Sequence, residues 1–236
     1  MQNNNYEWLL FDADETLFSF DAFAGLTKMF ANYHVDFTEQ DYSAYQQQNL
    51  PLWVQYQNGE ITAKQLQEQR FAFWGAKLQV APSKLNQDFL VAMSEVSKCL
   101  PFALEVISQL AKRYKLAVVT NGFTELQQNR LHKTGLAEYF QAVFISEQIG
   151  VAKPDVRVFE HILKQLNITT KETVLMVGDT LTSDIQGGVN AGVDTCWYNP
   201  HSHENHTELT PTYEIKSLHE LLTLIHWAVP SHFPES

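Results

Sequence analysis

Cysteine is scarce in this chain, and Cys99 and Cys196 are the only two among 236 residues. Two cysteines do not make a disulfide framework, so we expect both to be buried thiols in a reducing compartment. The sequence also lacks any apolar run near the ~18–20 residues that a membrane helix needs. The first residues, Met1–Tyr6, have neither the basic nor the apolar region of a secretory signal. We therefore expect a cytoplasmic protein that does not bind a membrane.

Basic residues are the second shortage. Lys and Arg number 16 against 27 Asp and Glu, which gives a formal net charge of -11. The field of the whole molecule repels polyanions, and no run rich in Lys or Arg offers them a local patch, so we expect no nucleic-acid partner. Charges beyond about 8–10 Å are largely screened at physiological salt. A small anionic ligand would therefore need a metal, a lysine or a helix N-terminus beside it.

The pattern of apolar residues predicts the fold class. A chain of 236 residues, 44% of them hydrophobic, can bury one main core and a second, smaller domain. Short apolar runs predict buried parallel strands, and amphipathic segments of helical length alternate with them. This alternation predicts an α/β fold with a doubly wound, Rossmann-like parallel sheet. The expected strands are Trp8–Asp12, Leu116–Thr120, Ala142–Ser146, Val174–Gly178 and Thr195–Tyr198. The expected helices between and after them are Phe102–Tyr114, Thr124–Thr134, Asp155–Leu166, Thr182–Ala191 and Leu218–Ile225.

One segment interrupts the alternation of strand and helix. Between about Phe20 and Lys98 there is no convincing strand, and apolar residues recur at helical spacing. We expect an all-helical cap at residues 19–98, inserted after the first strand, with residues 1–18 and 99–236 forming the α/β core. The expected cap helices are Phe20–Tyr33, Glu39–Tyr56, Ala63–Leu78 and Lys84–Val96.

Two acidic side chains come directly after the first expected strand. Asp12 and Asp14 follow the apolar run Trp8–Phe11, and α/β proteins bind their ligands at the carboxyl ends of such strands. Two carboxylates one residue apart cannot both ionise comfortably without a cation nearby. The pair therefore indicates a bound metal or one raised pKa. This arrangement predicts an enzyme.

Two further fragments offer binding groups for an anion. Thr120 and Asn121 end the second expected strand and can form an anion seat together with main-chain N–H groups. Lys153 precedes Pro154, which we expect at the first position of a helix, where the lysine is held to meet an anion as a point charge. Taken alone, the first fragment also fits an ordinary turn and the second a solvated surface lysine.

A fourth fragment contains Asp179 and Asp184. Asp179 leaves a strand directly after Gly178, and Asp184 lies in the first turn of the next expected helix, where it could also be a simple N-cap. In a doubly wound sheet all four fragments converge on one edge. Because independent structural explanations for all four are improbable, we interpret them as one catalytic site.

In order, spacing and residue type, the four fragments resemble the haloacid dehalogenase-like hydrolase superfamily. The helical insertion is similar to the mobile cap of that superfamily. Longer segments of core and cap look like its bacterial pyrimidine 5'-nucleotidase branch, and the similarity spans essentially the whole chain. These segments are Leu10–Phe23, Pro51–Gly59, Thr120–Gln128 and Asp184–Gly192.

The resemblance implies a magnesium-dependent phosphatase that acts through an aspartyl-phosphate. Its expected substrates are nucleoside 5'-monophosphates, foremost pyrimidine nucleotides such as dUMP, UMP and dTMP. Asp12 would be the nucleophile, and Asp14 would protonate the leaving oxygen and later activate water. Asp12, Asp179 and the main-chain carbonyl of Asp14 would hold Mg²⁺.

The remaining polar residues are expected to act on the transferred phosphoryl group. By the same resemblance, Thr120 and the amide of Asn121 would bind its oxygens. Lys153 would offset the charge that builds on them and on the nucleophile. Asp184 would lie behind the metal ligands and orient a metal-bound water or Lys153.

Recognition of the leaving group falls to the cap, because the core contacts only phosphate. A planar base can stack on aromatic side chains near the cap hinge, and we expect Phe20, Phe23 and Trp53 to contact the substrate. The other aromatic residues of the cap are expected to pack between its helices. The expected partner is a small phosphate ester, and the chain is expected to be a monomer or a weak homodimer.

Other functions remain open at this point. A phosphatase of sugar phosphates or a phosphomutase would share the core motifs, whereas a haloacid dehalogenase would need no proton donor at Asp14 because halide leaves unprotonated. A receiver-like phosphoacceptor switch also combines acids, Thr and Lys around Mg²⁺, but it needs no cap. A phosphonate hydrolase would need a cap lysine to form a Schiff base. The cap lysines are Lys28, Lys64, Lys77, Lys84 and Lys98.

Overall fold

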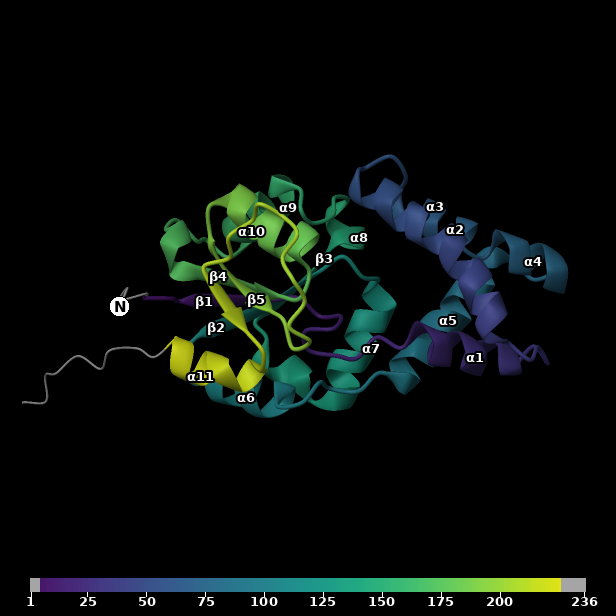
Figure 1. Cartoon of the computed structure of the whole chain (residues 1–236), viewed down its shortest axis with the longest axis horizontal. Coiled ribbons are helices and arrows are strands. Elements are labelled where there is room, and N and C mark those ends of the chain that lie inside the picture. Colours follow the sequence, from purple (N-terminus) through teal and green to yellow (C-terminus); the bar gives the residue numbers. More distant parts are fainter. Residues whose placement is uncertain (1–4, 226–236) are drawn as a thin grey trace, which may run out of the picture.

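The computed structural model describes residues 5–225, and a six-stranded parallel sheet lies at the centre of its α/β part (Figure 1). The order of the strands across the sheet is β3-β2-β1-β4-β5-β6. Their bounds are Trp8–Phe11 (β1), Lys115–Thr120 (β2), Ala142–Ile145 (β3), Val174–Gly178 (β4), Asp194–Tyr198 (β5) and Tyr213–Ile215 (β6). The predicted doubly wound α/β fold is confirmed. Only β6 was missed, because three residues are too few to show a period.

Helices cover both faces of the sheet, as the alternation of side chains along β1 requires. Leu9 and Phe11 point to one face and contact the same hydrophobic cluster as α6 and α11, whereas Trp8 and Leu10 point to the other face, beside α9 and α10 (Figure 1). The bounds of these helices are Ala103–Leu110 (α6), Val156–Gln165 (α9), Gln186–Ala191 (α10) and Leu221–Leu224 (α11). Helix α7 (Thr124–Thr134) follows β2, and the short α8 (Ser146–Ile149) follows β3. Each predicted core helix has a counterpart, and α8 was not anticipated.

Five helices between β1 and α6 form a further hydrophobic cluster beside the carboxyl ends of the strands (Figure 1). Their bounds are Ala22–Ala31 (α1), Glu39–Gln57 (α2), Ala63–Gln69 (α3), Ala72–Leu78 (α4) and Pro82–Val96 (α5). We refer to α1–α5 as the helical insertion. Thr38 and Thr62 begin α2 and α3 with capping boxes, in which each hydroxyl accepts a hydrogen bond from a main-chain N–H in the first turn.

The prediction of one helix over Ala63–Leu78 was wrong, because the chain bends between α3 and α4. The bend falls at Arg70 and Phe71, whose side chains are both buried. Arg70 donates hydrogen bonds to Asn86 on α5, and Phe71 packs against Phe89 on the same helix. These contacts come from a distant segment of the chain, so the periodicity of α3 and α4 alone does not reveal the bend.

The strand order places a topological switch point beside β1. Phe11 pairs with Val118 of β2 and with Val177 of β4, so β1, β2 and β4 end at similar heights. The residues that follow these three strands therefore meet at one edge of the sheet, which is where open α/β sheets bind their ligands.

Within residues 5–225, no helix is both long enough and apolar enough to cross a membrane. Cys99 and Cys196 are free thiols.

Candidate active site

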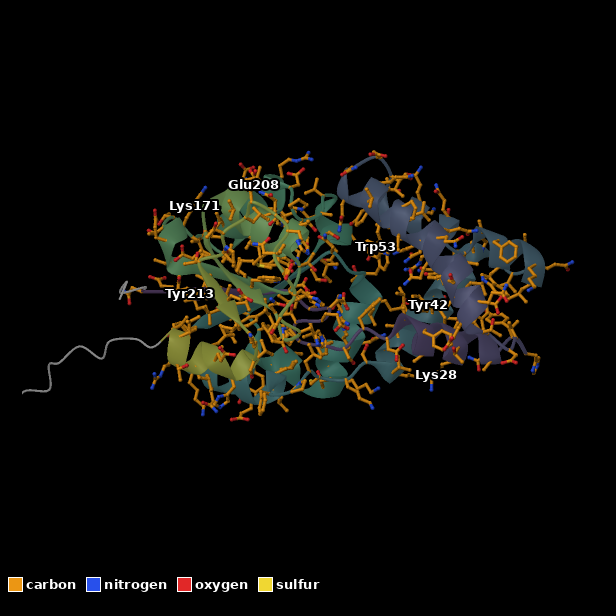
Figure 2. All side chains as sticks on the ribbon, viewed as in Figure 1. Lys28, Tyr42, Trp53, Lys171, Glu208 and Tyr213 are labelled. Carbon is orange, nitrogen blue, oxygen red and sulfur yellow. The ribbon has the colours of Figure 1, made fainter. Side chains whose placement is uncertain are left out.

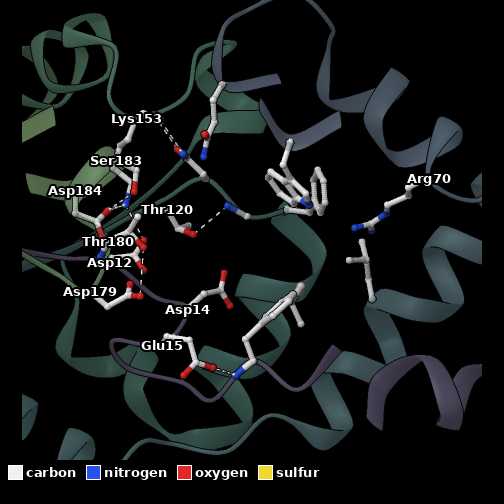
Figure 3. A pocket seen from close by; sticks show the side chains of 18 of the residues that line it. Asp12, Asp14, Glu15, Arg70, Thr120, Lys153, Asp179, Thr180, Ser183 and Asp184 are labelled. Carbon is white, nitrogen blue, oxygen red and sulfur yellow. Dashed lines mark hydrogen bonds and ion pairs between the residues drawn. The ribbon is translucent and has the colours of Figure 1, made fainter. Parts of the chain in front are cut away.

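A cavity of about 270 Å³ opens at the carboxyl edge of the sheet, between the sheet and the helical insertion (Figure 3). One end is polar and holds the carboxylates of Asp12, Asp14 and Asp179. The other end is mainly apolar and is lined by side chains of the insertion together with Phe123 and Leu126. The four sequence fragments thus meet at the same cavity.

Lys153 is the central cation of the polar end. Its ammonium Nζ lies 2.6 Å from Asp12 Oδ1 and 2.7 Å from Asp184 Oδ1, and it also donates to the main-chain oxygen of Val119 at 2.6 Å. Its side chain is 1% exposed. Burial opposes the charge, but the two carboxylates outweigh burial and raise the pKa of Lys153 above its ordinary value. Lys153 is therefore a fixed positive charge.

Asp12, Asp179 and Asp184 form an acidic cluster whose carboxylate oxygens lie within 4.8 Å of one another. Burial, and then Asp184, raises the pKa of Asp179 to about 7. Burial also raises the pKa of Asp12 well above the usual carboxyl range, although Lys153 opposes the shift. If all three carboxylates lost their protons, the cluster and the ammonium together would carry two excess negative charges, which a divalent cation would balance.

The donor set of this cluster fits a hard cation. Magnesium binds through one or two carboxylates and completes its coordination shell with waters and phosphate oxygens. Asp12 and Asp179 belong to the predicted set of ligands, and the third carboxylate of the cluster is Asp184 rather than the side chain of Asp14. Asp184 also makes the predicted contact with Lys153.

The chain around Asp179 fixes the orientation of the acidic cluster. The hydroxyl of Thr180 donates to Asp179 Oδ2 at 3.2 Å, and the indole N–H of Trp197 donates to the main-chain oxygen of Asp179 at 2.8 Å. The main-chain N–H of Thr180 donates to Asp184 Oδ2 at 3.0 Å. A Cβ at position 178 would lie 2.3 Å from the same oxygen of Asp184, so only glycine fits at Gly178.

Thr120 is oriented by two donors. Its hydroxyl oxygen accepts from the main-chain N–H of Gly122 at 3.0 Å and from Gln127 Nε2 at 3.2 Å. A hydroxyl has two acceptor positions and one proton, so the proton of Thr120 is left to donate to a third group. Thr120 lines the cavity, where an anion can accept that proton.

Asn121 holds the segment that carries Lys153. Its side-chain amide exchanges two hydrogen bonds with the main chain of Lys153, at 2.9 Å and 2.8 Å. The prediction that Pro154 begins the following helix was wrong. Helix α9 begins at Val156 because Asp155 is its N-cap and accepts from the main-chain N–H of Arg157. The position of Lys153 is therefore set by Asn121 and by the two carboxylates.

A buried network behind Asp14 was not found by sequence reasoning. Arg130 Nη1 lies 2.6 Å from Asp14 Oδ1, and the Arg130 side chain is 0% exposed. The guanidinium also donates twice to Gln127 Oε1 and lies 4.5 Å from the centroid of the Phe18 ring. Gln127 in turn donates to Thr120, so α7 ties the Asp14 and Thr120 sites together. The only available signal was a basic residue on a polar helix, which normally indicates a solvated face.

Of the three aromatic residues expected to contact substrate, Phe20 and Trp53 line the cavity. Trp53 lies on the side of α2 that faces the α/β part, and its ring packs 5.4 Å from that of Phe123 (Figure 2). Phe23 is not brought to the cavity. Its ring instead packs against Phe37 and Tyr42 inside the helical insertion.

A match to a known family model identifies the family of this chain. Residues 6–192 match the model of the haloacid dehalogenase-like hydrolase family. The chain belongs to this family. The resemblance of the four fragments is thereby confirmed, and the chain is an enzyme of a hydrolase family whose motifs meet at one cavity.

Two relatives are similar over nearly the full length of this haloacid dehalogenase-like hydrolase. The chain is 49% identical to pyrimidine 5'-nucleotidase YjjG of Escherichia coli strain K12 over 220 residues, which cover 93% of this chain and 98% of the relative. It is 40% identical to pyrimidine 5'-nucleotidase PynA of Streptococcus pneumoniae over 222 residues, which cover 92% and 94%. Among solved structures, the HAD-hydrolase YfnB of Bacillus subtilis bound to magnesium superposes with a TM-score of 0.80. It is 32% identical, and the match covers 94% of this chain and 99% of that one.

The first prediction concerns the ion pair between Arg130 and Asp14 in this hydrolase. Breaking a buried ion pair by removing one partner costs about 3–5 kcal/mol, and we expect the lower end for Arg130→Met because Asp14 is partly exposed. Urea unfolding measures this loss. Arg157→Met is the matched control, since Arg157 pairs with Asp155 on the surface and its removal should change stability little. Equal stabilities of the two variants would contradict a structural role for the network.

The second prediction is that a divalent cation and protons compete for the acidic cluster. Because the pKa of Asp179 is raised to about 7, this carboxyl is partly protonated near neutral pH and must lose its proton when a cation binds. Affinity for Mg²⁺ should therefore increase as the pH rises through 7 and decrease as the pH drops below 7. Isothermal titration calorimetry in buffers of different ionisation enthalpy measures both the affinity and the protons released.

Matched variants identify the carboxylates involved in this competition. Asp179→Asn should lose both cation binding and proton release. Glu15→Gln should retain them, since Glu15 lines the cavity outside the acidic cluster. Cation binding that does not depend on pH would show that the raised pKa of Asp179 plays no part.

Proposed function

We propose that this hydrolase is a magnesium-dependent phosphatase that cleaves nucleoside 5'-monophosphates, with pyrimidine nucleotides preferred. One observation supports this proposal most strongly. Asp12, Lys153 and the acidic cluster lie at one end of a cavity whose other end is aromatic. The first end suits a phosphate with its metal ion, and the second suits a flat organic group. The names of the two long relatives support the choice of nucleotide over other phosphate esters.

The first half of the reaction transfers the phosphoryl group to Asp12. An oxygen of Asp12 forms a bond to phosphorus while the bond between phosphorus and the 5' oxygen breaks, and Asp14 gives its proton to the departing oxygen. The products are an aspartyl-phosphate and a nucleoside. Within Asp14, Oδ1 contacts Arg130 at 2.6 Å and Oδ2 has only a long contact of 3.5 Å to Gln127, so Oδ2 is the better proton carrier.

The second half of the reaction regenerates the carboxylate. Asp14, now ionised, takes a proton from water, and the water oxygen forms a bond to phosphorus as the bond to Asp12 breaks. Phosphate leaves, and both aspartates return to their starting states. One pair of carboxylates thus performs nucleophilic and acid-base chemistry in turn.

Three residues would hold the phosphoryl group during both steps. The remaining proton of Thr120 and the main-chain N–H of Asn121 would donate to its oxygens, because the side chain of Asn121 already bonds the main chain of Lys153. Lys153 would neutralise charge on Asp12 and on the transferred group. These interactions would hold the phosphorus beside the carboxylate of Asp12.

Asp12, Asp179 and the main-chain oxygen of Asp14 would hold Mg²⁺, with Asp184 beside them. When bound, the cation supplies the positive charge that lets an anionic carboxylate approach an anionic phosphate. We place the hydrolase in the cytoplasm, as a monomer or weak homodimer. We assign residues 19–98 to a cap that binds the leaving group, with residues 1–18 and 99–236 as its catalytic core.

The position of Asp14 and the lysines of the insertion favour this reaction over its alternatives. Asp14 lines the cavity, where it would serve as a proton donor that a dehalogenase does not require. None of the five cap lysines is among the described residues that line the cavity, so a Schiff base with a phosphonate substrate has no candidate there. Lys28 and Lys84 instead pair with Glu95 and Asp88 on the surface.

The third prediction tests the substrate class. With Mg²⁺ present, UMP, dUMP and dTMP should give a higher kcat/KM than ribose 5-phosphate, because only a nucleotide places a ring in the aromatic end of the cavity. They should also give a higher kcat/KM than purine nucleotides, as the names of the two long relatives suggest. Release of inorganic phosphate over many turnovers measures this order. Higher activity on sugar phosphates would remove the nucleotidase proposal. A single turnover with a persistent phosphoenzyme would instead support a phosphoacceptor switch.

The fourth prediction separates the two aspartates. Asp12→Asn should abolish turnover, since an amide cannot act as the nucleophile. Asp14→Asn should slow turnover by about 10²–10⁴-fold, the usual contribution of a general acid-base residue. Stopped-flow and steady-state assays measure both, and circular dichroism checks the fold. A loss below tenfold for Asp14→Asn would mean that another group donates the proton.

A further inference from the structure

Arg70 is a buried cation that the proposed chemistry does not use. It lies between α3 and α4, is 3% exposed, and lines the cavity at the end away from Lys153 (Figure 3). None of the ion pairs found among residues 5–225 includes Arg70. Guanidinium remains charged in proteins, so this site holds a positive charge away from water without a carboxylate partner.

The described partners of Arg70 are neutral. Its Nε donates to Asn86 Oδ1 at 3.0 Å, and its Nη2 donates to the same oxygen. The hydroxyl of Tyr45 is a further neutral partner, and it opposes the lowering of the Arg70 pKa by burial. Two donors on one amide oxygen fix the orientation of the guanidinium, and even with the contact to Tyr45 part of its donor capacity stays unused, because the group carries five N–H bonds.

Aromatic rings hold the guanidinium on several sides. Its central carbon lies 5.3 Å from the ring centroid of Phe71, 5.1 Å from that of Phe89 and 5.0 Å from that of Phe123. Such contacts stabilise a cation and exclude water, and they also make the surrounding wall flat and apolar. A ligand that fills this end must therefore combine a flat body with a hydrogen-bond acceptor at its edge.

Trp53 and Phe20 also line the cavity and add flat aromatic walls to it. A sugar phosphate has no flat apolar body to place there, whereas a nucleobase has one. The base must present an acceptor to Arg70, because guanidinium only donates. Uracil and thymine carry carbonyl oxygens on both sides of the ring, which meets this requirement.

We propose that Arg70 is the specificity-determining residue of the cap and that it donates a hydrogen bond to a ring carbonyl oxygen of the pyrimidine base. This inference rests on the proposed nucleotidase function. It adds the residue that recognises the base, Arg70, and the group that is recognised, a ring carbonyl oxygen. Asn86 is the positioning residue that aims the guanidinium.

The test compares kcat/KM for UMP with kcat/KM for ribose 5-phosphate, which keeps the phosphate and lacks the base. In Arg70→Met the ratio should fall by about 10- to 100-fold, the usual range for a lost hydrogen bond to a charged donor, while activity on ribose 5-phosphate stays within threefold. Lys77→Met is the matched control. Lys77 is also a cap cation over an aromatic ring, that of Trp74, but it lies outside the cavity, and its loss should leave the ratio unchanged.

Two analogues of UMP, each without one ring carbonyl oxygen, identify the atom that is read. The wild-type enzyme should lose activity on one analogue by the same factor that Arg70→Met loses on UMP, and the variant should not distinguish that analogue from UMP. If Arg70→Met unfolds, Arg70→Lys keeps the buried charge without the planar fork and should shift the ratio in the same direction. A purely structural role would lower the melting temperature and both activities together, leaving the ratio intact.

The outcomes separate this inference from the proposed function. Wild-type preference for UMP that persists in Arg70→Met would overturn the role of Arg70 and leave the nucleotidase in place. A wild-type enzyme that prefers ribose 5-phosphate would overturn both. Loss of the preference in Arg70→Met, with Lys77→Met unaffected, would support both.

Discussion

The site depends on the ammonium of Lys153, which contacts Asp12 and Asp184 at 2.6 Å and 2.7 Å. These contacts join the end of β1, the turn after β4 and the segment before α9, which are far apart in sequence and meet only in the folded sheet. Removal of the ammonium would leave the acidic cluster without its resident counter-charge, and like charges in a buried space repel strongly. The geometry of the carboxylates is therefore inseparable from the position of Lys153. That position in turn depends on the two hydrogen bonds that the main chain of Lys153 exchanges with the side chain of Asn121.

An acidic protein can bind an anionic substrate only if some of its few basic side chains lie close to the bound anion. The chain has a net charge of -11, yet three of its 16 basic residues are buried around one cavity. Arg130 is paired with Asp14 and Lys153 with the acidic cluster, whereas Arg70 has neutral partners. The first two hold in place the carboxylates for which we propose catalytic and metal-binding roles. The third has no carboxylate partner among the described residues, and this difference in counter-charges supports the proposal that Arg70 faces the substrate.

The residues of the site that end or directly follow strands were predictable from the sequence. An apolar run locates the strand and therefore also the residue at its last position and the one that comes after it. Asp12, Thr120 and Asp179 are placed in this way by β1, β2 and β4. The parts carried by helices were not. Arg130 and Gln127 lie on a polar helix, α7, and their burial depends on what packs above it. The bend at Arg70 likewise arises from Asn86 and Phe89 on another helix, which no local pattern of α3 or α4 contains.

Phe123 connects the two ends of the cavity. It lies three residues after Thr120, in the loop that would bind the phosphoryl group, yet its ring contacts Trp53 and the guanidinium of Arg70 in the helical insertion. A base that fills the space between these rings would press on Phe123, and the shared loop would transmit that contact to Thr120. Binding energy from the leaving group could then improve the alignment of the phosphoryl group, which is how remote contacts raise kcat rather than only lowering KM. A sugar phosphate would make no such contact, so under the proposed function the aromatic end of the cavity would discriminate in the transition state as well as in binding.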